Sequence, residues 1–156
     1  MAYPLTIAIV GRPDAAYEGL LARRCGLLRP FSRVDVVRVK AVSVGAGSAV
    51  PAACEQEARR LTAACPSASW LVGLWPDGVL RDSAGFASWL GGHMMAGRRL
   101  AFLIGGAYGL APSLRNGCRE RVSLSPLTLP HDMALLVLLE QLYRAFTILA
   151  GHPYHK

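Results

Sequence analysis

Two apolar segments in the last third of the chain, FLIGGAYGL at Phe102 to Leu110 and SLSPLTLPH at Ser123 to His131, decide its fold class. Each has the pattern of a buried strand that stops at a loop of small residues. In an α/β protein such loops lie at the carboxyl edge of a parallel sheet, where bare backbone can approach a ligand. The two segments therefore predict a ligand-binding edge in an α/β fold.

The rest of the chain alternates strand and helix patterns. In the predicted helix 51–64, for example, Cys54, Ala58 and Leu61 recur at helical spacing and give it one face that can cover a sheet. This alternation predicts a mostly parallel sheet with helices on both faces. The predicted strands are 5–10, 34–39, 70–74, 100–104 and 121–123, and the predicted helices are 15–28, 51–64, 83–96, a short turn from Pro112, and 131–149.

The chain has 156 residues and a formal net charge of +7. A chain of this length can bury a core of its own, so we expect one domain, residues 1–156. Its four cysteines have no CxxC pair and no histidine at metal-ligand spacing, which predicts neither a disulfide framework nor a metal site. The basic excess favours an anionic partner such as nucleic acid, but a solvated basic surface explains it as well.

Neither end of the chain predicts export or a membrane span. Residues 1–10 are apolar but lack a basic leader and turn at Gly11-Arg12-Pro13, as expected of a first strand. Residues 133–149 are also apolar, but Glu140 and Arg144 leave an uncharged run far short of the ~18 residues that a span requires. With thiols expected to be reduced, these features predict a cytoplasmic protein that has no membrane partner.

The predicted helix 131–149 is too apolar to face a sheet alone. Asp132 is expected to face the positive end of its dipole, and Gly151 supplies a left-handed stop. Leu136 and Val137 extend the apolar stripe to a second side of this helix. The extra apolar surface predicts contact with another subunit.

The two loops allow more than one interpretation. Glycines in the loop 105–109 remove the Cβ atoms that would hold a flat ligand away from the backbone, but a tight turn needs them equally. Leucines in 124–129 can enclose an aromatic base while backbone groups bond its edge. The stretch Gly45-Ala46-Gly47-Ser48 lacks the third glycine of a phosphate loop, since Val50 stands there, and predicts an ordinary connection.

Histidines are the remaining candidates for chemistry. His93 has apolar neighbours on its helix face and is expected to be structural. His131 begins the last helix beside the ligand loop, so a cap and a functional role are both open, and His152 and His155 lie in a polar tail. The sequence contains no Ser-His-Asp order, nucleophile elbow or cluster of carboxylates, so hydrolysis is not predicted.

Four motifs together resemble the RlmH family of ribosomal RNA large-subunit methyltransferases, which are SPOUT-class enzymes. They are IGGAYGL at 104–110, SLSPLTLPH at 123–131, LEQLYRA at 139–145 and HPYH at 152–155. The detailed match covers roughly the last third of the chain, and the rest agrees in length and element order. The resemblance implies a parallel α/β sheet tied in a trefoil knot, with a cofactor-binding knot at about 70–150 and a tail at 151–156.

The same resemblance implies a homodimer that uses S-adenosylmethionine to methylate N3 of a pseudouridine in 23S rRNA of the assembled large ribosomal subunit. It implies no metal and no DNA partner. Candidate catalytic residues are His131, Arg144, Tyr154 and His155, the last three at positions that face the RNA and the partner subunit's site. The implied cofactor contacts are Leu74, Gly105, Leu124, Ser125, Pro126, Leu127, Thr128 and Leu129.

The chain departs from the family at two positions. Leu135 stands where an arginine usually follows His131 by four residues, and Trp75 replaces the aspartate after the leucine of the third strand. Loss of that arginine either weakens contact with RNA phosphates or is compensated elsewhere. Two alternatives stay open here: a non-catalytic relative that binds RNA or the ribosome, and, from the α/β pattern alone, a flavodoxin-like nucleotide-binding module.

Overall fold

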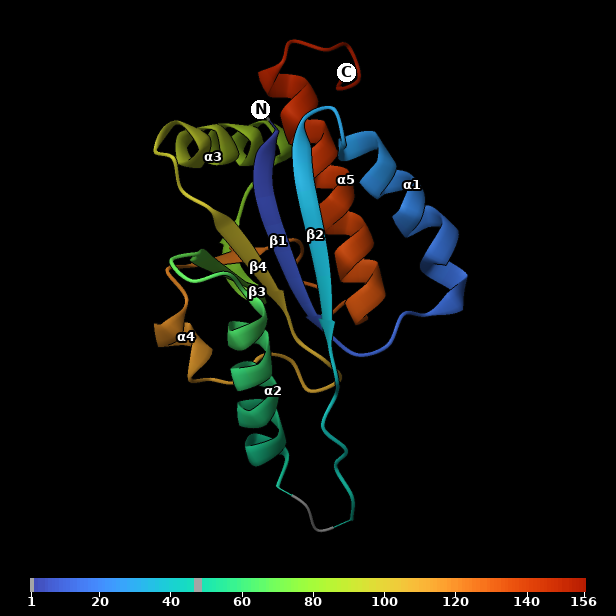
Figure 1. The fold of residues 1–156 in the computed structure, drawn as a ribbon, viewed down its shortest axis with the longest axis vertical. Coiled ribbons are helices and arrows are strands. Elements are labelled where there is room, and N and C mark those ends of the chain that lie inside the picture. The colour runs from blue at the N-terminus through green and yellow to red at the C-terminus, as the bar shows by residue number, and fades with distance from the viewer. Residues whose placement is uncertain (1, 47–48) are drawn as a thin grey trace.

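A computed structural model describes residues 2–46 and 49–156. Within these residues the chain forms a five-stranded sheet in which every neighbouring pair of strands is parallel (Figure 1). The order across the sheet is β2-β1-β4-β3-β5, so the predicted parallel sheet is confirmed. The strands are β1 (Tyr3–Val10), β2 (Ser32–Val39), β3 (Trp70–Leu80), β4 (Leu100–Ile104) and β5 (Glu120–Ser123).

Helices cover both faces of this sheet, as the sequence predicts. Leu5, Ile7 and Ile9 of β1 join one hydrophobic cluster, and Ala8 and Val10 join another. Successive side chains of a strand point to opposite faces, so the two clusters lie on opposite sides of the sheet. The first cluster includes α1 (Glu18–Leu28), α3 (Ser83–Met95) and α5 (His131–Leu149), and the second includes α2 (Val50–Ala64) and α4 (Leu114–Gly117); a short 3-10 turn, η1 (Ala15–Tyr17), precedes α1.

The central position of β4 in the sheet explains why its sequence is apolar without alternation. All five of its residues, LAFLI, are buried, and Phe102 and Leu103 are completely inaccessible. A parallel strand covered by helices on both faces has no side that meets water. The pairs of β4 with β1 and with β3 then place its carboxyl end, at Ile104, in the middle of the sheet edge.

Strand β3 is longer than the sequence predicts. The prediction ends it at Leu74 because Pro76 and Gly78 suggest a turn, but pairing with β5 continues to Leu80. Both Leu74 and Val79 oppose Val122, so the residues between them form a bulge. Gly78 allows this close approach, because a Cβ atom there would lie 2.7 Å from the carbonyl carbon of Val122.

The long helix α5 crosses the molecule from the carboxyl edge of the sheet to the end where both chain termini lie (Figure 1). Gly151, at φ +68°, ends it in the left-handed conformation that the sequence predicts. Leu138, Leu139 and Leu142 are completely buried on its inner side. α5 thus packs against α1 and α3 while it lies over the sheet.

In the described part of the chain, no helix has both the length and the apolarity needed to cross a membrane. The predicted connection at 45–48 is described only in part, since Gly47 and Ser48 lie outside the described residues.

Candidate functional site

Three neighbouring strands bring the predicted cofactor residues to one edge of the sheet. Leu74 lies on β3, Gly105 follows β4 directly, and the segment Leu124–Leu129 follows β5. Because β4, β3 and β5 are adjacent and parallel, these residues meet at the carboxyl edge. This is the edge at which open α/β sheets bind ligands.

The glycine loop after β4 is a tight turn. Gly106 forms an isolated bridge with Gly109, which has φ +77°. A Cβ atom on Gly105 would lie 2.5 Å from the carbonyl carbon of Gly109, so the turn itself requires glycine there. The turn leaves Tyr108 exposed at its tip and presents the backbone of Gly105 beside β3.

The segment Leu124–Leu129 presents unpaired backbone. None of its six residues forms a backbone-to-backbone hydrogen bond within the described chain, and the N–H of Leu127 donates instead to Ser125 Oγ over 3.0 Å. The Leu127 side chain is 73% exposed, whereas Leu124 packs against the core. The free backbone donors and acceptors suit hydrogen bonds to the edge of a purine base, and the exposed side chain of Leu127 suits contact with its face.

His131 begins α5 directly after this segment. Its Nε2 lies 3.2 Å from the carbonyl oxygen of Arg12, and its ring packs against Gly11, which has φ +104°. When Nε2 donates to that carbonyl, the lone pair of the imidazole lies on Nδ1. No hydrogen bond to Nδ1 is formed within the described residues, so this nitrogen is free to accept a proton.

A buried ion pair holds the start of α5 against β2. Asp132 is 2% exposed, accepts from Arg38 over 2.6 Å, and accepts from the N–H of Asp14 over 2.6 Å. Burial alone would raise the pKa of Asp132, but the Asp14 N–H and the Arg38 guanidinium outweigh it and lower the pKa. The sequence predicts only a dipole contact for Asp132, because no local pattern shows that Arg38 lies beside it.

The other predicted catalytic residues gather around Glu140, in the middle of α5. Arg144 donates to Glu140 Oε1 over 2.8 Å, and the hydroxyl of Tyr154 donates to the same oxygen over 2.9 Å. Arg144 also lies 3.1 Å from His155 Nδ1, and its guanidinium stacks over the Tyr154 ring at 4.8 Å. Arg24 of α1 adds an ion pair to Glu140 at 3.2 Å, so the tail is fixed to the helical face.

One chain does not bring the four candidate catalytic residues together. His131 lies at the first residue of α5, and Arg144 lies in its penultimate turn. At 1.5 Å of rise per residue the two positions are about 20 Å apart along the helix. The tail residues Tyr154 and His155 follow Arg144, so they too lie far from the cofactor loops of their own chain.

The two departures from the family pattern point into the protein. Leu135 is 1% exposed and belongs to the core between α5 and the sheet, so its side chain does not reach the surface of this chain. Trp75 is 8% exposed, and its ring fills the space above Gly73, where a Cβ atom would lie 2.1 Å away. Both residues therefore change core packing.

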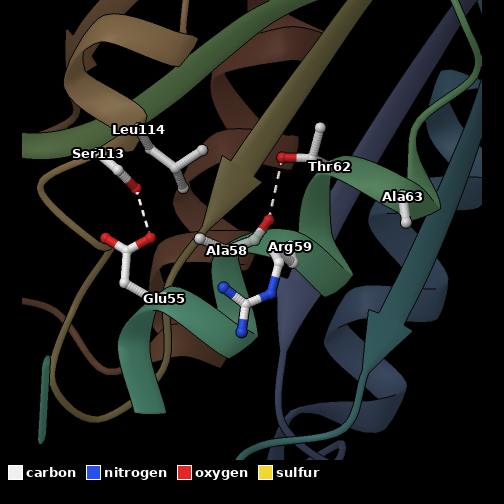
Figure 2. A pocket seen from close by; sticks show the side chains of 7 residues that line it. All are labelled: Glu55, Ala58, Arg59, Thr62, Ala63, Ser113 and Leu114. Atoms are coloured by element: carbon white, nitrogen blue, oxygen red, sulfur yellow. Dashed lines mark hydrogen bonds between the residues drawn. The ribbon is translucent and has the colours of Figure 1, made fainter. Parts of the chain in front are cut away.

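Two open hollows lie away from the predicted cofactor residues. The first, about 390 Å³, lies between α2 and the start of α4 (Figure 2), and the second, about 440 Å³, lies along β2. In the first, Ser113 donates to Glu55 over 2.8 Å and Thr62 donates to the Ala58 carbonyl over 3.0 Å. These polar groups pair with each other, as in a groove between two packed elements.

Comparison with known proteins identifies the class. Residues 4–155 match the family model described as a predicted SPOUT methyltransferase. A probable methylase family protein from Haemophilus influenzae Rd KW20 has a similar fold, with a TM-score of 0.58 at 15% identity over 97% of this chain and 70% of that chain. The fold, with its loops at the carboxyl edge, is that of a SPOUT methyltransferase, an enzyme class that uses S-adenosylmethionine.

Full-length relatives narrow the class to a family. The chain is 41% identical over 160 residues to the ribosomal RNA large subunit methyltransferase H of Gemmatimonas aurantiaca, a match that covers 97% of this chain and 99% of the relative. It is 39% identical over 157 residues to the protein of the same name from Delftia acidovorans, with 97% and 98% covered. The chain belongs to the RlmH family, and the resemblance carried by its four motifs is confirmed.

Replacing Asp132 with Asn should destabilise the protein by about 3 kcal/mol near pH 7, because breaking a buried ion pair costs ~3–5 kcal/mol. Folding lowers the pKa of Asp132, so its stabilisation is complete above the unfolded-state pKa of about 3.9 and is lost as the pH falls through the folded value. Urea denaturation should therefore show the difference between the two proteins closing below about pH 4.

Asp35→Asn is the matched control, since Asp35 is exposed and meets Arg33 at 3.5 Å. It should change the free energy of unfolding by less than about 1 kcal/mol at any pH. A stability difference for Asp132→Asn that does not change with pH would show that the ion pair is not its cause.

Replacing Leu135 with Arg should destabilise the protein by on the order of 4 kcal/mol, since it places an unpaired charge in the core. Met133→Arg, at a position 37% exposed on the same helix, should be tolerated. Thermal unfolding of both variants measures the difference. A Leu135→Arg protein as stable as wild type would mean that this side of α5 reaches solvent.

Proposed function

We propose that this protein is a homodimeric enzyme that methylates N3 of a pseudouridine in 23S rRNA of the assembled large ribosomal subunit. The observation that carries the proposal is that Gly105 and Leu124–Leu129 follow the carboxyl ends of β4 and β5, while Leu74 lies on β3, the strand between them. Its support from relatives is the name of the full-length proteins, ribosomal RNA large subunit methyltransferase H. The same name favours an enzyme over a non-catalytic relative.

In this proposal the carboxyl-edge loops bind S-adenosylmethionine, which supplies an electrophilic methyl group on sulfur. The unpaired backbone of Leu124–Leu129 bonds the edge of the base, and Leu127 covers its face. Correct alignment of the methyl acceptor accounts for much of the rate, since proximity can supply ~7–11 kcal/mol. The protein must also accept the imide proton from N3 of the base.

The hydrogen bonds favour His131 over His155 as the proton acceptor. Arg144 donates to Nδ1 of His155, which leaves the proton of a neutral ring on Nε2 and no free lone pair. His131 has the opposite arrangement, with Nε2 bonded to the Arg12 carbonyl and Nδ1 free. We assign the base role to Nδ1 of His131, and a positioning role toward the RNA to Arg144 and Tyr154.

A second copy of the chain would complete this site. Arg144 is about 20 Å along α5 from His131, and Tyr154 and His155 contact Glu140 and Arg144, so these residues can serve the loops of a partner whose α5 runs in the opposite direction. Leu136 and Val137 stay partly exposed on the outer side of α5 and supply apolar surface for that contact. The proposal also includes a trefoil knot within about residues 70–150, a tail at 151–156 and a cytoplasmic location.

The first test is methyl incorporation into large ribosomal subunits from a strain that lacks this modification. Wild-type protein should transfer labelled methyl groups to one pseudouridine, and Arg144→Ala should reduce transfer by about 100-fold while the affinity for S-adenosylmethionine, measured by calorimetry, is unchanged. Arg24→Ala is the control, because it removes another ion pair to Glu140 without touching the tail. Cofactor binding without any transfer by wild type would reject the enzyme in favour of a non-catalytic relative.

The second test is subunit mixing. Leu127→Glu should disable the cofactor loop without unfolding the chain, because this side chain is exposed, and Arg144→Ala should disable the tail. A purified heterodimer of the two variants has one site with an intact loop and an intact tail, so it should regain roughly half of the wild-type rate. A heterodimer as inactive as both parent dimers would show that each chain uses its own tail.

A further inference from the structure

A cluster of aromatic and charged side chains lies at the amino ends of β3 and β5, away from the cofactor loops. Glu120 is its centre: Oε1 accepts from the indole N–H of Trp70 over 3.0 Å, and Oε2 accepts from that of Trp89 over 2.7 Å. His93 Nε2 lies 2.9 Å from Oε1. Burial would raise the pKa of Glu120, but these donors outweigh it and lower the pKa, so the carboxylate is ionised and its oxygens are engaged.

His93 is neutral in this cluster and adds no compensating charge. It is 4% exposed, and burial is the largest cause that lowers its pKa. Arg98 lies 3.4 Å from Nδ1, which makes Nδ1 the acceptor and leaves the proton on Nε2, facing Glu120. The structural role predicted for His93 therefore agrees with its burial and its partners.

Two guanidinium groups converge on the ring of Trp70. The Cζ atom of Arg98 lies 4.0 Å from the ring centroid, and that of Arg119 lies 5.4 Å from it. Both arginines are exposed, and neither forms an ion pair with a carboxylate in the described part of the chain. Two like charges on one indole repel each other, and the nearby carboxylate of Glu120 is already occupied by Trp70, Trp89 and His93.

Two more exposed arginines, Arg99 and Arg121, lie at nearby backbone positions. The backbone carbonyl oxygen of Arg99 accepts a hydrogen bond from the N–H of Trp70 over 2.7 Å, and Arg121 stands opposite Gly73 on the edge strand β5. Neither is ion-paired to a carboxylate among the described side chains. We call Trp70, Arg98 and Arg119 the Trp70 surface, and the carboxylate nearest to its two arginines, that of Glu120, is already engaged by Trp70, Trp89 and His93.

We propose that the Trp70 surface is a second contact for ribosomal RNA, separate from the methyl-transfer site. Its arginines have exposed N–H groups that match phosphate oxygens, and a guanidinium stacked on an indole keeps a fixed orientation for that bond. An anion placed between Arg98 and Arg119 would remove their repulsion. Arginine planes and aromatic rings also stack with the unpaired bases of RNA. An acidic protein partner has no such bases, so this surface suits RNA better.

The position of this surface fits an extended RNA. Tyr3 at the start of β1 donates its hydroxyl hydrogen to the carbonyl of Arg98, so Arg98 lies at the end of the molecule where both termini are found (Figure 1). That end also holds the tail with Arg144, Tyr154 and His155. One RNA could therefore contact the tail and the Trp70 surface of the same chain.

This inference rests on the proposed function for the identity of the RNA, and binding is its test. The double variant Arg98→Gln, Arg119→Gln should bind a 23S rRNA transcript more weakly than wild type. Each lost phosphate contact should reduce the slope of log affinity against log salt by ~0.7–0.9. The control is Arg23→Gln, Arg29→Gln, two exposed arginines of the α1 region that change the net charge equally.

A charge-retaining variant separates binding from folding. Arg98→Lys, Arg119→Lys should keep most of the wild-type slope, while thermal unfolding and S-adenosylmethionine affinity should stay unchanged in both double variants. Equal losses in the glutamine variant and its control, or no loss in either, would overturn the inference. The inference would also be overturned if polyglutamate of matched charge bound the Trp70 surface with the same affinity as the transcript.

The two proposals can fail separately. Binding of the transcript that depends on Arg98 and Arg119, without methyl transfer by wild type, would reject the enzyme and leave the RNA surface. Methyl transfer with RNA binding that is insensitive to these arginines would reject the surface and leave the enzyme.

Discussion

Leucines on the inner side of α5 pack against the sheet, and this contact fixes where the two halves of the candidate site can lie. Leu135, Leu138, Leu139 and Leu142 are at most 1% exposed, and each buried leucine stabilises the fold by about 1.5–3 kcal/mol. The helix cannot rotate or slide without exposing them. Its first residue, His131, is therefore held at the carboxyl edge and Arg144 near the opposite end of the molecule.

Polar contacts then secure the two ends of this helix in different ways. At its start, Asp132 meets Arg38 and the N–H of Asp14 out of solvent, which ties α5 to the loop after β1. Toward its other end, Arg144 meets Glu140 of the middle turn, which also meets Arg24 and Tyr154, all at partly exposed positions. The buried contact sets the position of His131 within its own chain, whereas the exposed one leaves the tail on the surface, where a partner can meet it.

The sequence predicts the elements of this fold well, because they depend on local patterns. The unbroken apolar run of β4 and the glycine at 151 are seen in the structure as predicted. The predicted end of β3, at Leu74, is wrong, because the extension of this strand depends on pairing with Val122, which is remote in sequence. The meeting of Leu74, Gly105 and Leu124–Leu129 depends on the strand order β4-β3-β5, which no local pattern predicts.

Contacts between distant side chains are what the sequence could not predict. Glu120 joins Trp70, fifty positions away, and Trp89 of another element, and no periodicity relates them. Arg38 and Asp132 are separated by 94 positions. The complete burial of Leu135 likewise depends on the packing of α1, α3 and the sheet around this particular helix.

The burial of Leu135 and Trp75 changes what their departure from the family pattern means. An apolar residue at a buried helix position alters core packing, and no loss of RNA contact follows from it. The charges that we propose to meet RNA lie elsewhere, at the partly exposed Arg144 and on the Trp70 surface. Contacts to phosphate position an RNA without selecting the base, so they would serve an enzyme and a non-catalytic binder alike. The residues that distinguish an enzyme from a non-catalytic binder are therefore the carboxyl-edge loops and His131, where the proposal places methyl transfer to N3 and removal of its proton.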